Sequence, residues 1–180
     1  MEAFEALQKS WEERVRAMGL TSESSHPAYA WQEGEKEPPC QVIRQPLKEG
    51  FRTLSREGRP VAPLMGDYTS YDDGLTGVCF NPTSFFNASS DHAVIPRILP
   101  NTVAETAMEF IWLVRADAVE GTDYCIEDLI WLWKVTTDQD VKIVEDNQKG
   151  VNSRSYRPGP YSKLEGGPAR FISDYLKQIS

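Results

Sequence analysis

A long helical pattern near the end of the chain, over residues 125–148, constrains the fold more than any other feature. Its side chains on one stripe recur at three- and four-residue spacing. They are Ile126, Leu129, Ile130, Trp133, Val144 and Asn147. A helix with a largely apolar stripe needs a second layer to cover it. The sequence therefore predicts a long helix packed against another layer of the same chain.

Three segments before this helix have the residue types of β-strands: residues 77–89, 92–100 and 102–117. Ser89-Ser90-Asp91 and Pro100-Asn101 mark turns between them. In the third segment apolar and polar residues alternate, and the set that ends in Phe110 and Trp112 is expected to face the core. Residues 40–47 and 51–55 are two shorter strand candidates. The short connections favour an antiparallel sheet.

Two more helices are expected, one at each end. Residues 3–18 place apolar side chains at helical spacing, and Gly19 is a plausible end. A last helix carries Phe171, Ile172 and Tyr175, with Ser162 and Glu165 as a capping box at its start. The predicted fold class is α+β: a helix-grip (START-like) antiparallel sheet wrapped around a long C-terminal helix. Such a fold commonly encloses a cavity between helix and sheet.

Size and charge narrow the classes of function. The chain has 180 residues, enough for one domain with a core, and a formal net charge of −8. An acidic surface argues against nucleic acid or an anionic membrane as the main partner. No apolar run approaches the roughly 20 residues of a membrane span, and no signal-type segment opens the sequence, so the expected compartment is the cytoplasm. The three cysteines form no C-x-x-C pair, which argues against a zinc ribbon or dithiol centre.

Asp140 is the unexpected residue of the long helix, because it falls on the apolar stripe. It lies seven residues after Trp133 and four before Val144. Three interpretations stay open. The carboxylate reaches water or a basic side chain at the edge of the stripe; it accepts a hydrogen bond from Thr136 or a tryptophan N–H; or it faces a cavity as a metal ligand or catalytic acid or base.

The two histidines do not decide between these interpretations. His26 lies in a polar loop, and His92 opens a strand after a turn. A surface or turn position is favoured over a ligand role for each. The glycines form neither a G-x-G-x-x-G nor a Walker pattern, so nucleotide binding has no support.

Several longer segments carry a resemblance to a known family. They include WLVRADAVEGTDY, LIWLWKVTTDQDVKIVEDNQKGVNSRSYRPGPYSKLE, RFISDYL, LKEGFRTLSREGRPVAPLMGDYTSYDDG and SSDHAVIPRILP. The chain resembles the C-terminal catalytic-domain region of Rieske non-haem iron (aromatic-ring-hydroxylating type) oxygenase α subunits. The branch most similar is the glycine betaine and choline monooxygenase type. The pattern D-x7-Q-x-G-x-x-S-x-x-Y-x-P-G-x-Y-S-x-x-E, which begins at Asp140, is long enough to be specific.

The resemblance implies a helix-grip catalytic domain with a mononuclear Fe(II). Two histidines and one aspartate hold that iron and leave open positions for oxygen. The aspartate lies eight residues before the glutamine of the Q-x-G motif, which is Gln148 here, so the matching ligand is Asp140. The candidate walls of a substrate pocket are Ile130, Trp133, Thr137, Phe80, Phe85 and Trp112. Core packing is the alternative role for each of them.

The chain also departs from the family pattern. The C-x-H and C-x-x-H motifs that bind the 2Fe–2S cluster do not occur, since Cys79 and Cys125 lack the following histidines. The D-x-x-H-x-x-x-x-H segment that supplies the iron-binding histidines does not occur either. We therefore expect one catalytic-type domain over residues 1–180, with no N-terminal Rieske domain and no 2Fe–2S cluster. With one iron ligand of three visible, the chain alone is expected to be inactive.

Three functional hypotheses follow. The first is a portion of an oxidoreductase that uses O2 to hydroxylate or oxidatively demethylate a small substrate. Its expected partners are a Rieske-domain polypeptide, a reductase and further copies of the chain, because the family forms trimers. The second is a helix-grip module without redox activity that binds a quaternary ammonium or aromatic ligand. The third is a fragment that folds poorly or associates with another polypeptide.

Overall fold

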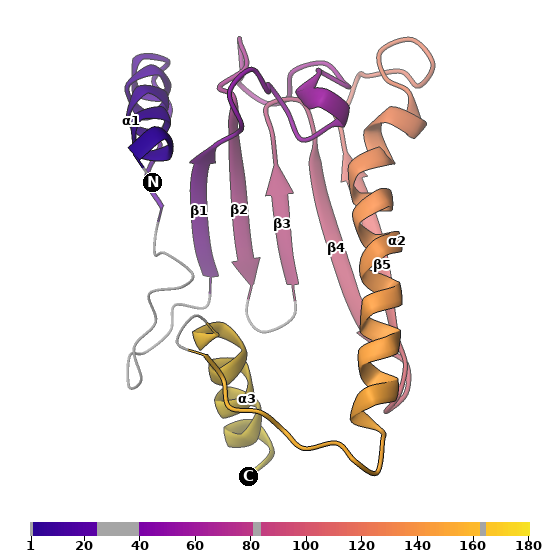
Figure 1. Cartoon of the computed structure of the whole chain (residues 1–180). Coiled ribbons are helices and arrows are strands. Elements are labelled where there is room, and N and C mark those ends of the chain that lie inside the picture. The colour runs from indigo at the N-terminus through magenta and orange to yellow at the C-terminus, as the bar shows by residue number, and fades with distance from the viewer. Residues whose placement is uncertain (1, 25–39, 81–83, 163–164) are drawn as a thin grey trace.

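The computed structural model describes residues 2–24, 40–80, 84–162 and 165–180. Within these ranges five strands and four helical elements follow one another along the chain (Figure 1). They are α1 (Glu2–Ala17), β1 (Cys40–Pro46), the short 3-10 helix η1 (Arg56–Gly58), β2 (Gly74–Phe80), β3 (Ser84–Ala88), β4 (Ala93–Pro100), β5 (Thr106–Leu113), α2 (Ile126–Val151) and α3 (Gly166–Ile179).

The strands form one antiparallel sheet in the order β1-β2-β3-β4-β5, so each strand pairs with its neighbour in sequence. This confirms the predicted α+β class and antiparallel sheet. The segment 77–89, predicted as one strand, falls on two strands, because β2 pairs with β3 from Thr76–Ala88 to Phe80–Ser84. The strand predicted at residues 51–55 is wrong. Thr53 and Ser55 are buried there, and the backbone bonds locally, from Ser55 N to Thr53 O, instead of in a strand ladder.

The register decides which side chains share a face of the sheet, because paired residues on neighbouring strands point the same way. Phe85 pairs with Cys79. Asn87 pairs with Val94, which in turn pairs with Trp112. The face that these residues share continues along β4 and β5 through Pro96 and Phe110. Helix α2 lies on this face, since the Trp133 ring contacts the rings of Phe85 and Phe110.

Helix α1 is attached to the sheet through Trp11 and Val15, both fully buried. The Trp11 indole N–H donates to the Asp72 carbonyl at 2.8 Å, and the Arg44 guanidinium lies 5.2 Å from the centre of the Trp11 ring. A Cβ at Gly74 would approach the Trp11 ring to 2.6 Å, so this position needs glycine. The residues 3–18 predicted as a helix match α1 closely.

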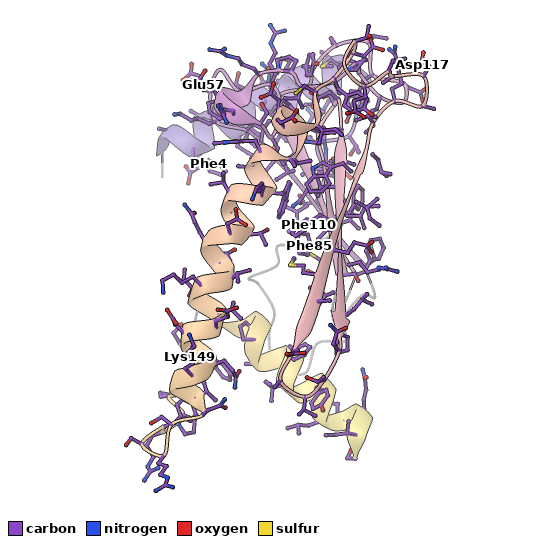
Figure 2. The ribbon with its side chains drawn as sticks, turned by 90° about the vertical axis from the view of Figure 1, so that its right-hand side faces the viewer. Phe4, Glu57, Phe85, Phe110, Asp117 and Lys149 are labelled. Atoms are coloured by element: carbon purple, nitrogen blue, oxygen red, sulfur yellow. The ribbon has the colours of Figure 1, made fainter. Side chains whose placement is uncertain are left out.

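Helix α2 extends three residues beyond the predicted end at 148, but the sheet covers only its first part. Leu129 is buried and residues 130–133 are half-buried, whereas every residue from 138 to 150 is exposed. Figure 2 shows α2 approaching the strands near Phe85 and Phe110 and diverging from them toward Lys149. The apolar stripe therefore continues past the sheet with Val144 in solvent.

Helix α3 begins at Gly166, after the residues of the predicted capping box. The backbone N–H of Ser162 donates to the Glu165 carboxylate at 2.6 Å, which is one half of that box. Phe171 and Tyr175 stack with ring centroids 6.3 Å apart and remain exposed. No helix in the described ranges is both long and apolar enough to cross a bilayer.

Candidate functional site

An aromatic cluster joins α2 to the sheet, and we use that name for Phe85, Phe110, Trp112 and Trp133. The Trp133 ring lies 5.9 Å from the Phe85 ring and 5.7 Å from the Phe110 ring, measured between centroids. The Phe110 ring lies 5.8 Å from Trp112. The rings are tilted, with interplanar angles of 32–41°, and their centroid distances lie in the range of favourable aromatic pairs. Figure 2 shows Phe85 and Phe110 between α2 and the strands.

Local sequence explains how these rings meet. Phe110 and Trp112 are two residues apart on β5 and so lie on the same face. Trp133 lies one helical turn after the buried Leu129, which holds that stripe of α2 against the sheet. Phe85, Trp112 and Trp133 were predicted as pocket walls and Phe110 as a core residue; the structure brings their rings into contact, and the pocket role stays a prediction. Ile130 and Thr137, also predicted as pocket walls, are half-buried on α2 beside Trp133.

Phe80 was predicted to line the same pocket, and the structure corrects this. Phe80 pairs with Ser84, whereas the neighbouring residue Cys79 pairs with Phe85. Adjacent residues of a strand point to opposite faces, so Phe80 points away from the face that α2 covers. Phe80 is 47% exposed.

The two indole nitrogens of the cluster stand out. Trp112 Nε1 and Trp133 Nε1 are buried, and neither has a hydrogen-bond partner within the part of the chain that the structure describes. Tryptophan N–H groups usually find a partner when buried. Each unpaired buried donor costs about 1–3 kcal/mol relative to a paired one. The cluster therefore combines apolar ring faces with two unused donors.

Asp140 lies on α2 two turns beyond Trp133 and is exposed. Among the described residues it forms no ion pair and no hydrogen bond through its carboxylate, so it is not a structural partner of Thr136 or of a tryptophan. Its neighbours on the helix behave differently: Asp138 pairs with Lys134, and Asp146 pairs with Lys142 and Lys149. Of the interpretations left open by the sequence, the carboxylate that reaches water describes this conformation.

The donor set for a metal is incomplete in this part of the chain. No three His, Cys, Asp or Glu side chains among the described residues come together in a way that could hold a metal ion. His26 lies outside the described residues. His92 lies in a different part of the fold from Asp140, in the buried group described next. These residues by themselves therefore do not fit an iron centre, and Asp140 is a single candidate ligand.

A buried polar cluster, which the sequence did not predict, surrounds the turn before β4. His92 was expected at the surface or in a turn; it follows the turn but is only 1% exposed. Its Nδ1 lies 2.8 Å from Asp91 Oδ1, and Asp91 also accepts from the Thr53 hydroxyl and from the Val61 N–H at 3.0 Å. Burial alone would raise the pKa of Asp91, but the hydrogen bonds and charge of His92, with those other donors, hold it below its usual value.

The same cluster includes a buried ion pair between Arg44 and Asp72, at 2.6 Å. Ser90 donates its hydroxyl to Asp72 at 2.8 Å, and Arg44 donates to the Thr76 hydroxyl at 2.7 Å. Burial raises the pKa of the nearby Tyr71 to about 12, and the negative charge of Asp91 contributes to the increase. Every carboxylate oxygen of Asp72 and Asp91 accepts a hydrogen bond, so the cluster stabilises the turn. The run of polar residues at 89–92 has the composition of an exposed turn, which is why its burial was not apparent from the sequence.

Comparison with known proteins places the chain in a family. The family described as "Ring hydroxylating alpha subunit (catalytic domain)" matches residues 11–180. The chain therefore belongs to the ring-hydroxylating α-subunit family, in its catalytic-domain region, as the motif at Asp140 indicated. The match covers all five strands of the sheet as well as α2 and α3.

Individual proteins of similar sequence are glycine betaine monooxygenase subunits. A glycine betaine monooxygenase oxygenase subunit of Chromohalobacter salexigens is 40% identical over 136 residues, which are 74% of this chain and 31% of that protein. Proteins of the same description from two Pseudomonas aeruginosa strains are 36% identical over 140 residues, which are 77% of this chain and 33% of theirs. The chain spans about a third of the length of these curated relatives.

Proposed function

We propose that this chain is the C-terminal part of the catalytic domain of a Rieske-type non-haem iron oxygenase, and that Asp140 is its iron ligand. The observation that carries the proposal is the position of Asp140, eight residues before Gln148 in the motif, within a family match over residues 11–180. The reaction is O2-dependent hydroxylation or oxidative demethylation of a small substrate. The two imidazole ligands come from polypeptide outside the described residues.

The exposure of Asp140 supports a ligand role. A carboxylate with no ion pair among the described residues is available to a metal, whereas the paired Asp138 and Asp146 are already engaged. A three-ligand iron site with open positions requires side chains from separate elements, and a carboxylate on a helix that diverges from the sheet is accessible to them. The fold we propose is a helix-grip domain in which α2 is the central helix.

The substrate we propose is a quaternary ammonium compound, because the relatives are named as glycine betaine monooxygenase subunits. Aromatic faces attract such cations electrostatically, most strongly where water is excluded. The aromatic cluster, with half-buried Ile130 and Thr137 beside it, supplies those faces. We further propose a cytoplasmic protein that works with a Rieske-domain polypeptide and a reductase and assembles as a trimer.

Iron content of an assembled complex tests the proposal. The chain is co-expressed with a polypeptide that carries the C-x-H, C-x-x-H and D-x-x-H-x-x-x-x-H motifs, and iron per complex is measured by elemental analysis. We expect one mononuclear iron in addition to the cluster, and its loss in Asp140→Ala. Asp138→Ala, on the same exposed helix, is the matched control and should keep the iron. Equal iron in both variants would refute the ligand role.

A second candidate function, favoured by the aromatic rings that α2 and the sheet bring together, is a binding module without redox activity. Such a module would bind a small cation or aromatic molecule through the aromatic cluster alone. The discriminating measurement is ligand binding to the 180-residue chain by calorimetry in the presence of a chelator. Binding that is independent of iron, together with no iron in the co-expressed complex, would favour the module over the oxygenase.

A further inference from the structure

The two unpaired indole donors carry an inference about what the site recognises. Trp112 comes from β5 and Trp133 from α2, yet both rings contact the same Phe110 ring, with centroids 5.8 and 5.7 Å away. Both Nε1 atoms are buried and unpaired among the described residues. Two separate elements thus bring a donor each to one small aromatic region.

The neighbouring side chains explain why the donors stay unpaired. The rings in contact with the two indoles belong to Phe85 and Phe110, and phenyl rings offer no oxygen or nitrogen acceptor. Asn87 lies in the same row of the sheet as Trp112 through Val94, but it is not a partner of the Trp112 N–H. Other buried polar groups, such as Trp11 Nε1 and the Asp91 carboxylate, have partners. Unpaired donors are therefore specific to this region within the described chain.

We propose that Trp112 and Trp133 are a pair of hydrogen-bond donors for an oxygen acceptor of the bound small molecule. The acceptor is a carboxylate, carbonyl or hydroxyl oxygen, and the rings of Phe85 and Phe110 contact the apolar or cationic part of the same molecule. This inference deepens the proposed function and rests on it. It adds a polar requirement to a site that otherwise offers only aromatic faces.

The spacing of Trp133 and Asp140 along α2 indicates how a small ligand would lie between them. Asp140 lies seven residues after Trp133, which corresponds to about 10 Å along the helix axis. A molecule whose oxygen is held at the indoles would extend its other end along α2 toward Asp140. The donors would thus orient the ligand with respect to the proposed iron ligand.

Binding requires a small rearrangement, because both Nε1 atoms are closed to solvent. Each tryptophan side chain as a whole is only half-buried, and the proposal requires its ring to turn about the terminal torsion. An acceptor that pairs with the donors recovers the cost of leaving them unpaired, and that gain favours the turned conformation.

The test observes the donors directly. The chain contains five tryptophans, so its ¹⁵N–¹H spectrum has five indole signals, which single Trp→Phe variants assign. Glycine betaine supplies a carboxylate, choline a hydroxyl and tetramethylammonium no oxygen. We expect glycine betaine or choline to move the Trp112 and Trp133 signals downfield and slow their exchange with solvent. Tetramethylammonium should leave the exchange of both signals unchanged.

Affinity measured by calorimetry provides the second arm. Trp112→Phe and Trp133→Phe should each weaken binding of the oxygen-bearing probe roughly threefold to tenfold, the effect of one hydrogen bond. Their effect on tetramethylammonium should be smaller. Trp131→Phe is the matched control, because Trp131 lies on the same helix, under the Arg56 guanidinium at 4.8 Å, and outside the cluster.

Three results would overturn the inference: no response of either signal to any probe at saturating concentration, an equal response to tetramethylammonium, or equal affinity losses for probes with and without oxygen. None of these results bears on the iron content of the Asp140→Ala complex. Failure of the donor pair and failure of the proposed oxygenase are therefore distinguishable.

Discussion

Carboxylates have different surroundings in two regions of this molecule, the buried polar cluster and the second half of α2. At the end of the sheet near η1, Arg44, Asp72, Asp91 and His92 are all buried, and each is paired. In the second half of α2, Asp140 is exposed, and the apolar side chains of Val141, Ile143 and Val144 are exposed as well. Figure 1 shows η1 near the upper end of the sheet and the second half of α2 running downward, away from η1. A buried charge with a full set of partners supports the fold, whereas an unpaired carboxylate beside uncovered apolar residues is suited to a site completed by other groups.

The largest effect should come from breaking the buried ion pair. Asp72→Ala leaves the Arg44 guanidinium buried without its carboxylate and should destabilise the chain by about 3–5 kcal/mol in urea unfolding. The control is Glu109→Ala, which breaks the half-exposed pair with Arg97 and should cost at most about 1 kcal/mol. Similar losses of stability in the two variants would mean that the buried ion pair contributes no more to stability than the exposed one.

Helix α2 has one part that the sheet covers and one part that is exposed, so the two parts can be compared by substitution. Leu129→Ala removes a buried side chain at the covered end of the helix and should cost about 2–5 kcal/mol. Val144→Ala, two-thirds exposed at the open end, should change stability by less than about 0.5 kcal/mol in the chain alone. If Val144→Ala proved as costly as Leu129→Ala, the far part of α2 would be covered in solution, for example by a second copy.

Acid should weaken the buried cluster through Asp91. The folded state lowers the pKa of Asp91 below its usual value, so the unfolded chain binds more protons as the pH falls. The stabilisation is therefore complete above the usual aspartate range, near pH 4, and is lost as the pH falls through the lower folded value. Asp91→Asn should cost about 1–3 kcal/mol at pH 7 and flatten the acid side of the stability curve. Asp67→Asn, at an exposed position, is the control, and an unchanged acid limb in Asp91→Asn would refute this role.

The sequence predicted the contact between β5 and α2 much better than the buried polar cluster. Alternation on β5 and helical spacing on α2 located Trp112 and Trp133, because these are local patterns. The motif spacing singles out Asp140, and its role as an iron ligand stays a prediction. The face of Phe80 was not predictable, since it depends on the register of the β2–β3 pair and not on composition. The burial of His92 was missed because its partner Thr53 is 39 residues away in sequence, and no local pattern reports such a contact.

The smallest effect on stability should come from the residue with the largest proposed role. Asp140 has no ion-pair partner among the described residues and is exposed, so Asp140→Ala should leave the midpoint of urea unfolding of the chain alone within about 0.5 kcal/mol of the parent. Removing an acidic residue from α2 reduces repulsion in an acidic chain, so a slight gain in stability is also compatible with a ligand role. A loss as large as that expected for Leu129→Ala would assign Asp140 to the fold instead. Stability that is unchanged in the chain, combined with iron that is lost from the complex, would separate a functional carboxylate from the structural carboxylates of the buried cluster.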